Sequence, residues 1–498
     1  MKRLYKNLLM VIFFIAFNSC NESNIDLEAP FASDEEFFSN EDEFQTAVFG
    51  IYQKLQNFYT FNVNNPIHEV WLMPGDNATT ETGRLVPFNN FTEISTTDVH
   101  LQQYYKLSYQ LIARANTVLE KLEERGTGVF DDQNLATYNQ GEALFLRGLM
   151  FFRLWHFFGT APLITEVIDN TEAASVTNSS GTQLLDAAIE DLQAASQLLP
   201  SSWSDDLLGR ATSGAAFGLL GKVLTYRGVL SGNNNDFTSA ITAFNSVTGY
   251  ALLADFGANF DETAENNAES LFEVQFSRNS LGNNYWLLAD VQAGDGDAGG
   301  TWVMFDERTD QRGVPRVMAT TGLMNLFEAG DPRITESYDP TTGNVLKYVN
   351  RGNTSGNPGS FNNSRVLRYS DVLLMQAWAI AESGGSLSQA IELVNQVRTR
   401  AREFGGAGNT IPADRPTNET DQSTVLQWIL DERRMELAFE EAHRWFDLRI
   451  LHLTDRIDLQ NYDFGDPSAE TDFDNNELVY PFPANEVEVT DLNQNENY

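Results

Sequence analysis

The stretch GEALFLRGLMFFRLWHFFGTAPLIT occupies residues 141–165 and decides the fold class. Apolar side chains at helical spacing extend this run back to Leu135. Gly159 and Pro162 follow Phe158, and both residue types end helices. The pattern therefore predicts one long helix over residues 135–158, with an abrupt turn after it.

Similar runs lie on both sides of this helix. Asn40 and Glu43 form a capping-box pattern that begins an N-terminal helix. The same spacing of apolar residues predicts further helices over 99–125, with Gly126 as its end, and over 182–199, 214–229, 370–382, 387–402 and 424–441. These helices form antiparallel pairs joined by short turns, as in stacked tetratricopeptide-like units. The predicted fold class is mainly α, a tetratricopeptide-like helical-repeat scaffold with long irregular loops and a few short strands.

The middle of the chain has a different composition. Residues 231–365 are rich in Gly, Asn, Asp, Thr and Ser, and only ESLFEVQFS (269–277) alternates as a strand does. Long loops on a rigid scaffold often carry binding residues. We expect a single domain over residues 34–498. Its parts are an N-terminal helical part at about 34–260, a loop-rich insert at about 231–365 and a C-terminal helical part at about 366–498.

The only cysteine, Cys20, directly follows a short apolar run. Lys2, Arg3 and Lys6 precede that run, which covers about half of the roughly 20 apolar residues that a membrane span needs. This layout is typical of a bacterial lipoprotein signal peptide over residues 1–19. Acylation of Cys20 would anchor the mature chain, and residues 20–33 would form a polar tether. An ordinary cleaved signal peptide is the alternative.

The charge balance limits the partners of this protein. The chain has 70 acidic and 32 basic residues, a net charge of −38. Removal of residues 1–19 leaves 29 basic and 70 acidic residues, a net charge of −41. Such a surface repels nucleic acid and disfavours anionic polymers in general. A hydrophobic content of 42% with 12% aromatic residues is typical of a folded globule rather than a disordered acidic chain.

Several motifs, in order along nearly the whole chain, resemble the SusD/RagB family of surface glycan-binding lipoproteins of Bacteroidetes. The run at 141–165 closely follows a signature of that family, with Gly148 where alanine is usual. The stretch VLRYSDVLLMQAWAIAESG (366–384) resembles a later signature, with Trp378 where glutamate is usual. The other similar stretches are FFSNEDEFQTAVFGIYQKLQ (37–56), IARANTVLEKL (112–122), GRATSGAAFGLLGKVLTYRG (209–228), ILDERRMELAFEEAHRWFDLRI (429–450) and YPFPANEVEVTDLNQNENY (480–498).

This resemblance implies a lipid-anchored protein on the cell surface, in the outer membrane. It implies non-catalytic binding of a polysaccharide or oligosaccharide, which the protein hands to a TonB-dependent SusC-like transporter. In that family the lipoprotein is thought to cover the transporter barrel as a lid. The alternatives are a glycoside-cleaving protein and a purely structural surface lipoprotein.

The sequence contains no recognised catalytic motif. Its five histidines form no HExxH pattern, and neither a GxSxG nucleophile elbow nor a phosphate-binding glycine loop occurs. No EF-hand spacing is present, and we predict no metal and no cofactor. A carboxylate pair of the glycosidase type remains open, because acidic residues are abundant.

Charged residues also lie in apolar helical contexts. Glu432, Arg433 and Asp447 are either an acid–base group or structural ion pairs that fix the helix register. Recurrence at helix-packing spacing favours the structural interpretation. The other members of this set are Arg147, Arg368, Asp371, Arg434, Glu436 and Arg444.

The eight tryptophans indicate where a glycan could stack. Four lie at apolar helical positions and are expected in the core: Trp155, Trp378, Trp428 and Trp445. Trp71, Trp286 and Trp302 lie in polar stretches, and we predict that they form one exposed aromatic platform for a neutral polysaccharide. Tyr285 precedes Trp286, and Asp76 and Asn77, which follow Trp71, are expected to bond sugar hydroxyls. The alternative is that these tryptophans anchor loops on the scaffold.

Overall fold

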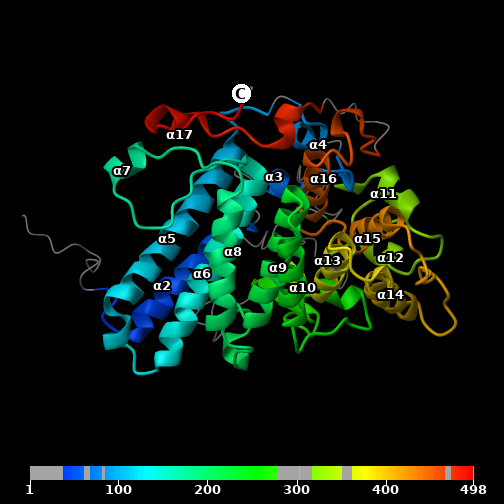
Figure 1. Cartoon of the computed structure of the whole chain (residues 1–498), viewed down its shortest axis with the longest axis horizontal. Coiled ribbons are helices and arrows are strands. Elements are labelled where there is room, and N and C mark those ends of the chain that lie inside the picture. The colour runs from blue at the N-terminus through cyan, green and yellow to red at the C-terminus, as the bar shows by residue number, and fades with distance from the viewer. Residues whose placement is uncertain are drawn as a thin grey trace, which may run out of the picture.

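The computed structural model describes residues 37–60, 68–80, 85–92, 94–276, 302, 305, 317–349, 362–465, 473–496 and 498. Within them the protein is mainly helical, and its helices lie side by side in antiparallel pairs (Figure 1). This confirms the predicted tetratricopeptide-like helical scaffold. The predicted signal peptide (1–19) and tether (20–33), with Cys20, lie outside the described residues.

The N-terminal half packs around one buried helix. Helix α6 (Gln133–Phe158) is buried over almost all of its length from Gly141 onward. It lies against α2 (Glu41–Asn57), α5 (Val99–Val129) and α8 (Gln183–Leu198). A Cβ at Gly148 would lie 3.0 Å from Cγ of Leu192 and 3.2 Å from the carbonyl oxygen of Ala188. The glycine therefore permits the close approach of α6 and α8.

The C-terminal half continues the same helical packing. Its helices are α9 (Ser213–Ser231), α10 (Asn234–Asn245), α13 (Tyr369–Glu382), α14 (Leu387–Phe404), α15 (Gln422–Glu436) and α16 (His443–Leu453). Helix α9 contacts α8 on one side and α10 and α13 on the other, so it joins the two halves. In Figure 1 the chain after α16 returns over the top of the N-terminal helices, where α17 (Ala484–Val489) lies.

Short elements connect these layers. Helices α3 (His68–Leu72), α4 (Val86–Asn90), α7 (Asn170–Ala174), α11 (Thr321–Leu326) and α12 (Ile334–Ser337) are one or two turns long. Strand β1 (Ala78–Thr79) pairs with β3 (Met318–Ala319), and β2 (Ser270–Val274) pairs with β4 (Ser364–Arg368), both antiparallel. The strand predicted at 269–277 is thus confirmed as β2.

Some helices differ from the sequence predictions. Helix α5 continues through Gly126 to Val129, because a glycine within a helix costs only about 1 kcal/mol. Helix α15 ends at Glu436 rather than 441. Helix α10 lies in the stretch predicted as loop-rich, where Phe237, Ala240 and Phe244 are buried.

The buried charges form ion pairs between segments that are distant in the chain. Arg368 lies 2.7 Å from a carboxylate oxygen of Glu440 and 3.1 Å from one of Glu436. Arg147 of α6 lies 2.7 Å from Asp191 of α8. All five side chains are at least nine-tenths buried. This confirms the structural interpretation of these charges.

Candidate functional site

Trp71 is buried, contrary to the prediction that it is exposed. It lies in α3 rather than in a loop, and 4% of its surface is accessible. Its ring packs edge-on against Trp302 at a centroid distance of 5.7 Å and lies 5.5 Å from Tyr59. Among the described residues its indole Nε1 has no hydrogen-bond partner. The polar neighbours in the sequence did not indicate this burial, because the contacts come from distant segments.

Trp302 is also buried, with 1% of its surface accessible. Its ring stacks on Tyr348 at a centroid distance of 4.0 Å and an interplanar angle of 6°. Its Nε1 donates a 2.7 Å hydrogen bond to Oγ of Ser364 in β4. The structure therefore brings Trp71 and Trp302 together as predicted, but as an interior row of rings and not as an exposed platform.

Asp76 and Asn77 lie in a buried cluster with two arginines. Asp76 is 2.7 Å from Nε of Arg444 and 3.2 Å from Arg434, and Tyr462 donates a 2.8 Å hydrogen bond to it. Burial alone would raise the pKa of Asp76, but the two arginines outweigh burial and hold it below its usual value. Asn77 accepts a 2.9 Å hydrogen bond from Nε of Arg434. We therefore assign both residues a structural role, which fixes the chain before β1 to α15 and α16.

Tyr285 and Trp286 lie outside the described residues. Their part in ligand binding stays a prediction. Of the helical tryptophans, Trp155, Trp378 and Trp445 are buried as predicted, and Trp428 is half-buried beside Arg415.

A cavity of about 250 Å³ adjoins the row of rings. We call it the Tyr348 cavity; it lies beside the one-turn helix Gly257–Phe260, and its other lining residues include Asp261, Glu262, Thr263, Glu336, Leu346 and Asn362. Tyr348 joins it to Trp302. Its polar lining is acidic and amide, with no lysine or arginine among the described lining residues.

Tyr348 has two unusual features. Its backbone adopts a φ of 61°, a left-handed conformation that is rare for a bulky residue. Its buried hydroxyl has no hydrogen-bond partner among the described residues. Strained residues with unsatisfied polar groups are typical of binding sites. The sequence prediction missed Tyr348, although an aromatic residue just before a Gly/Asn-rich stretch was the same signal that selected the tryptophans.

Another acidic residue, Glu265, lies near the residues that line the Tyr348 cavity. Asn363, which follows Asn362, donates a 2.7 Å backbone hydrogen bond to Glu265. Burial raises the pKa of Glu265 to about 8, and the nearby carboxylate of Glu273 adds to this, while Arg365 opposes it. Glu265 is therefore largely protonated at neutral pH.

The acid–base interpretation of Glu432, Arg433 and Asp447 is not supported. Glu432 lies 2.7 Å from both Arg333 and Arg398, whereas Arg433 bonds Asp447 at 2.9 Å. The two carboxylates thus belong to different ion pairs, and both are buried.

In the described part of the chain, no cluster of three or more His, Cys, Asp or Glu side chains could hold a metal ion. None of the helices in that part combines the length and the apolar character that crossing a bilayer requires.

Comparisons with known proteins agree with this architecture. A model described as the SusD family matches residues 298–498, and a SusD-like model described as "Starch-binding associating with outer membrane" matches residues 30–224. SusD-like protein P2 of Formosa agariphila is 26% identical, and the alignment covers 96% of each chain.

Solved structures show the same fold. A SusD superfamily protein from Bacteroides vulgatus has a TM-score of 0.71 at 24% identity, over 93% of this chain and all of that one. A structure titled as a laminarin-binding SusD-like protein has a TM-score of 0.69 at 24% identity, over 92% of this chain and all of that one.

Proposed function

The chain belongs to the SusD family, and from that premise we propose that it binds a neutral polysaccharide or oligosaccharide at the cell surface without cleaving it. A relative of the same fold is named for laminarin binding, and a matching family model is named for starch binding. Acylated Cys20 would anchor the protein in the outer membrane. The bound glycan would pass to a TonB-dependent SusC-like transporter.

The observation that carries this proposal is the Tyr348 cavity beside the stacked rings. Sugars present apolar C–H faces, which stack on aromatic rings, and hydroxyl groups, which bond carboxylates and amides. Tyr348, whose buried hydroxyl has no hydrogen-bond partner among the described residues, lines the cavity together with the exposed residues Asp261 and Thr263. Its acidic lining suits a hydroxyl-rich neutral ligand and disfavours an anionic one. Tyr285 and Trp286 would supply stacking surface.

The experiment is an affinity gel with laminarin, starch and other neutral glycans. Tyr348→Phe removes only the hydroxyl and should weaken binding by roughly tenfold, because a lost hydrogen bond of about 1.4 kcal/mol is a factor of ten. Trp286→Ala should have a similar effect through lost stacking. Trp428→Ala changes a half-buried tryptophan far along the chain and is the matched control.

Three results would contradict this proposal. Binding that is equal in wild type, Tyr348→Phe and Trp286→Ala places the glycan elsewhere. New reducing ends after incubation with the glycans would favour the glycoside-cleaving alternative. A chain for which no glycan is found, but which co-purifies with a transporter, would favour the purely structural one.

The anchor and the partner have separate tests. Mass spectrometry of the N-terminal peptide should find Cys20 acylated, and Cys20→Ala should move the protein out of the membrane fraction. Crosslinking in the native membrane should join the protein to a transporter, whereas self-contacts alone would contradict the lid arrangement.

A further inference from the structure

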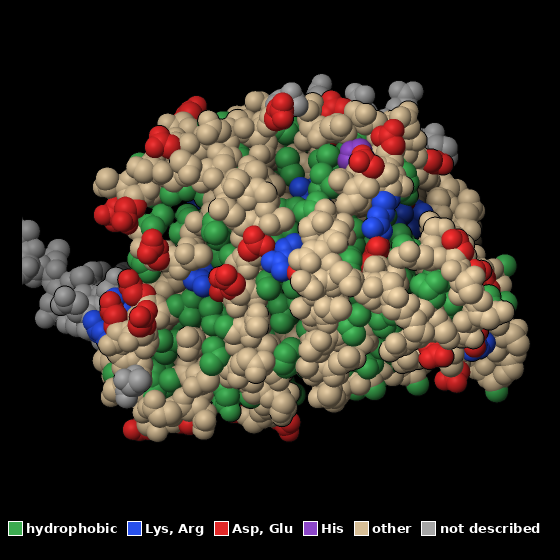
Figure 2. Space-filling view, viewed as in Figure 1, with side chains coloured by type: hydrophobic (Ala, Val, Ile, Leu, Met, Phe, Trp, Pro, Cys, Tyr) green, Lys and Arg blue, Asp and Glu red, His purple; other side chains and the backbone are tan. Residues whose placement is uncertain are grey.

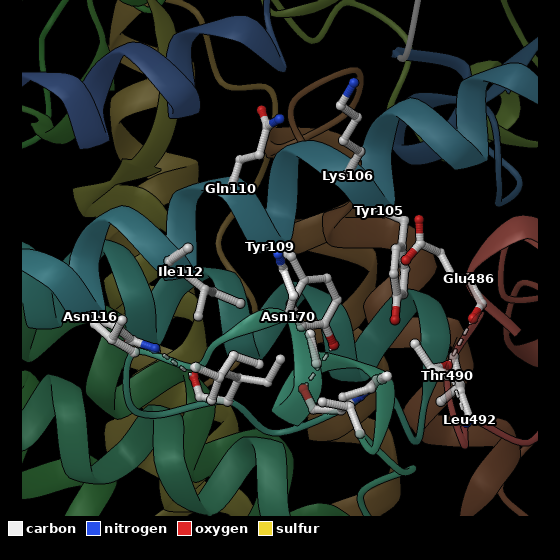
Figure 3. A pocket seen from close by; sticks show the side chains of 18 of the residues that line it. Tyr105, Lys106, Tyr109, Gln110, Ile112, Asn116, Asn170, Glu486, Thr490 and Leu492 are labelled. Atoms are coloured by element: carbon white, nitrogen blue, oxygen red, sulfur yellow. Dashed lines mark hydrogen bonds between the residues drawn. The ribbon is translucent and has the colours of Figure 1, made fainter. Parts of the chain in front are cut away.

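A second and larger hollow lies in the N-terminal half of the protein. It has a volume of about 570 Å³ and runs between α5, the chain at 162–176 and the C-terminal segment that includes α17 (Figure 3). We call it the α5 groove, and its apolar lining includes Tyr105, Tyr109, Ile112, Ile164, Val167 and Leu492. These residues come from other elements than those that line the Tyr348 cavity.

The outer wall of the α5 groove is fixed to α5 by side chains. Tyr109 donates a 2.8 Å hydrogen bond to the carbonyl oxygen of Pro162. Nδ2 of Asn116 donates to the carbonyl oxygens of Ile164 and Glu166, at 3.2 and 2.8 Å. Arg147 in turn holds Asn116 through a 2.7 Å hydrogen bond to its Oδ1. The groove is therefore formed in advance, and an occupant would not have to order its walls.

Exposed aliphatic side chains lie at the mouth of the groove. Val167 and Val489, on opposite walls, are 44% and 66% exposed. Leu163, in the same stretch 162–176 as Val167, is 36% exposed. Exposed apolar side chains that gather around a hollow mark an interaction site rather than ordinary surface.

The walls of the groove carry a strong local charge. The stretch 162–176 contains Glu166, Asp169 and Glu172, and the stretch 484–492 contains Glu486, Glu488 and Asp491, with no lysine or arginine in either. Lys106 is the one cation among the described lining residues. Acidic side chains surround the upper left of the molecule in Figure 2, where Figure 1 places α7. An occupant with positive charges beside its apolar groups matches this surface.

We propose that the α5 groove binds a segment of a partner protein in which apolar side chains lie next to lysines or arginines. The apolar side chains would fill the floor between Tyr109 and Ile164. The cations would lie against Glu166 and Glu486 at the rim. Such a segment buries apolar surface for affinity and uses the acidic rim for selectivity.

The test uses three short labelled peptides and fluorescence anisotropy with the full chain. The first peptide combines leucines and lysines, the second has glutamates in place of the lysines, and the third has serines in place of the leucines. The leucine–lysine peptide should bind at least tenfold more tightly than either of the others. Equal binding of the serine–lysine peptide would mean attraction by net charge alone, and would overturn the proposal.

Two variants locate the binding. Ala113 is exposed and lines the groove, so Ala113→Trp should fill it without changing the net charge or the core. Affinity for the leucine–lysine peptide should fall at least tenfold. The double variant Glu166→Lys/Glu486→Lys should have the same effect through the rim, and Glu392→Lys, on the exposed side of α14, is the control for charge.

Circular dichroism and thermal unfolding would establish that each variant is folded. The proposal is overturned if the leucine–lysine peptide does not bind, if it binds Ala113→Trp as tightly as wild type, or if Glu392→Lys weakens it as much as the rim variant does. It is also overturned if the leucine–glutamate peptide binds equally well, because the rim would then have no selectivity.

Discussion

Trp302 should act as a framework residue. Its ring is stacked between neighbours in the interior and its Nε1 is bonded to Ser364. Trp302→Ala should lower the free energy of unfolding by about 3–5 kcal/mol, the usual cost of removing a large buried aromatic side chain. Urea unfolding measures this, and Trp428→Ala should cost less because that side chain is half-buried. If the Trp302→Ala protein is as stable as wild type but no longer binds glycan, Trp302 contacts the glycan and is not a framework residue.

Glu265 should make stability depend on pH. Burial raises its pKa to about 8, whereas the unfolded chain ionises it near 4.5. Between these pH values the folded state therefore binds a proton that the unfolded chain has lost. The stability that Glu265 contributes to the folded state is fully present below pH 4.5 and is lost as pH rises through about 8. Glu265→Gln cannot ionise but keeps an acceptor for the N–H of Asn363.

We expect wild type to lose about 3–4 kcal/mol more free energy of unfolding between pH 5 and pH 8 than Glu265→Gln does. Urea unfolding at the two pH values measures the difference. Glu392→Gln, at an exposed position of α14, should behave as wild type. Identical pH dependence in wild type and Glu265→Gln would show that Glu265 is ionised throughout.

At the scale of whole helices, glycines set how closely two helices approach each other. A Cβ at Gly148 would press on Leu192 and on the backbone of Ala188. Gly148→Val should therefore lower the free energy of unfolding by about 1–3 kcal/mol through overpacking between α6 and α8. Gly128 in α5 has nothing within 4 Å of an added Cβ, so Gly128→Ala should be neutral or stabilising by up to about 1 kcal/mol. Equal effects of both substitutions on thermal unfolding would contradict this packing.

The helices could be predicted where a long amphipathic or apolar run decides the structure. Helix α6 is such a case, since only its first residues differ from the predicted 135–158. Helix α10 was missed because its first turn is Asn-rich and its apolar face is short. Its position depends on α9, where a Cβ at Gly221 or Gly228 would lie within 3 Å of Phe244 or Phe237. That complementarity appears only when the two helices are paired.

The candidate site was less predictable for a similar reason. A polar stretch of sequence indicates exposure, but Trp71 and Trp302 are covered by residues distant in the chain, such as Tyr59 and Tyr348. Asp76 likewise accepts hydrogen bonds from Arg434 and Arg444, which lie more than 350 positions later in the chain. Local pattern selects the residue types and the neighbourhood, and tertiary contacts decide which side chains face the ligand.

At the scale of the whole molecule, buried charges hold the two halves together. Nζ of Lys222, in α9, lies 2.7 Å from Asp371 of α13 and 2.7 Å from Nδ1 of His443 in α16. Burial alone would raise the pKa of Asp371, but Lys222 and Arg433 outweigh it and keep this carboxyl well below its usual range. Removing one partner of such a pair leaves an uncompensated buried charge, so the network fixes how α9 meets the C-terminal helices. The Tyr348 cavity and the α5 groove can then act on separate parts of one rigid scaffold.

The net charge of −38 should select among glycans. Neutral polymers such as laminarin have no long-range interaction with this surface, so their affinity should change little between low salt and about 0.5 M salt. A carboxylated or sulfated polymer must approach against repulsion that acts over about 10 Å at 0.1 M ionic strength. The acidic lining of the Tyr348 cavity adds to that cost at short range, where salt screens less. In affinity gels, neutral glycans should therefore retard the protein equally at both salt concentrations. Anionic glycans should not retard the protein at low salt. Strong low-salt retention by an anionic glycan would require a basic binding surface, and would move the site away from the Tyr348 cavity.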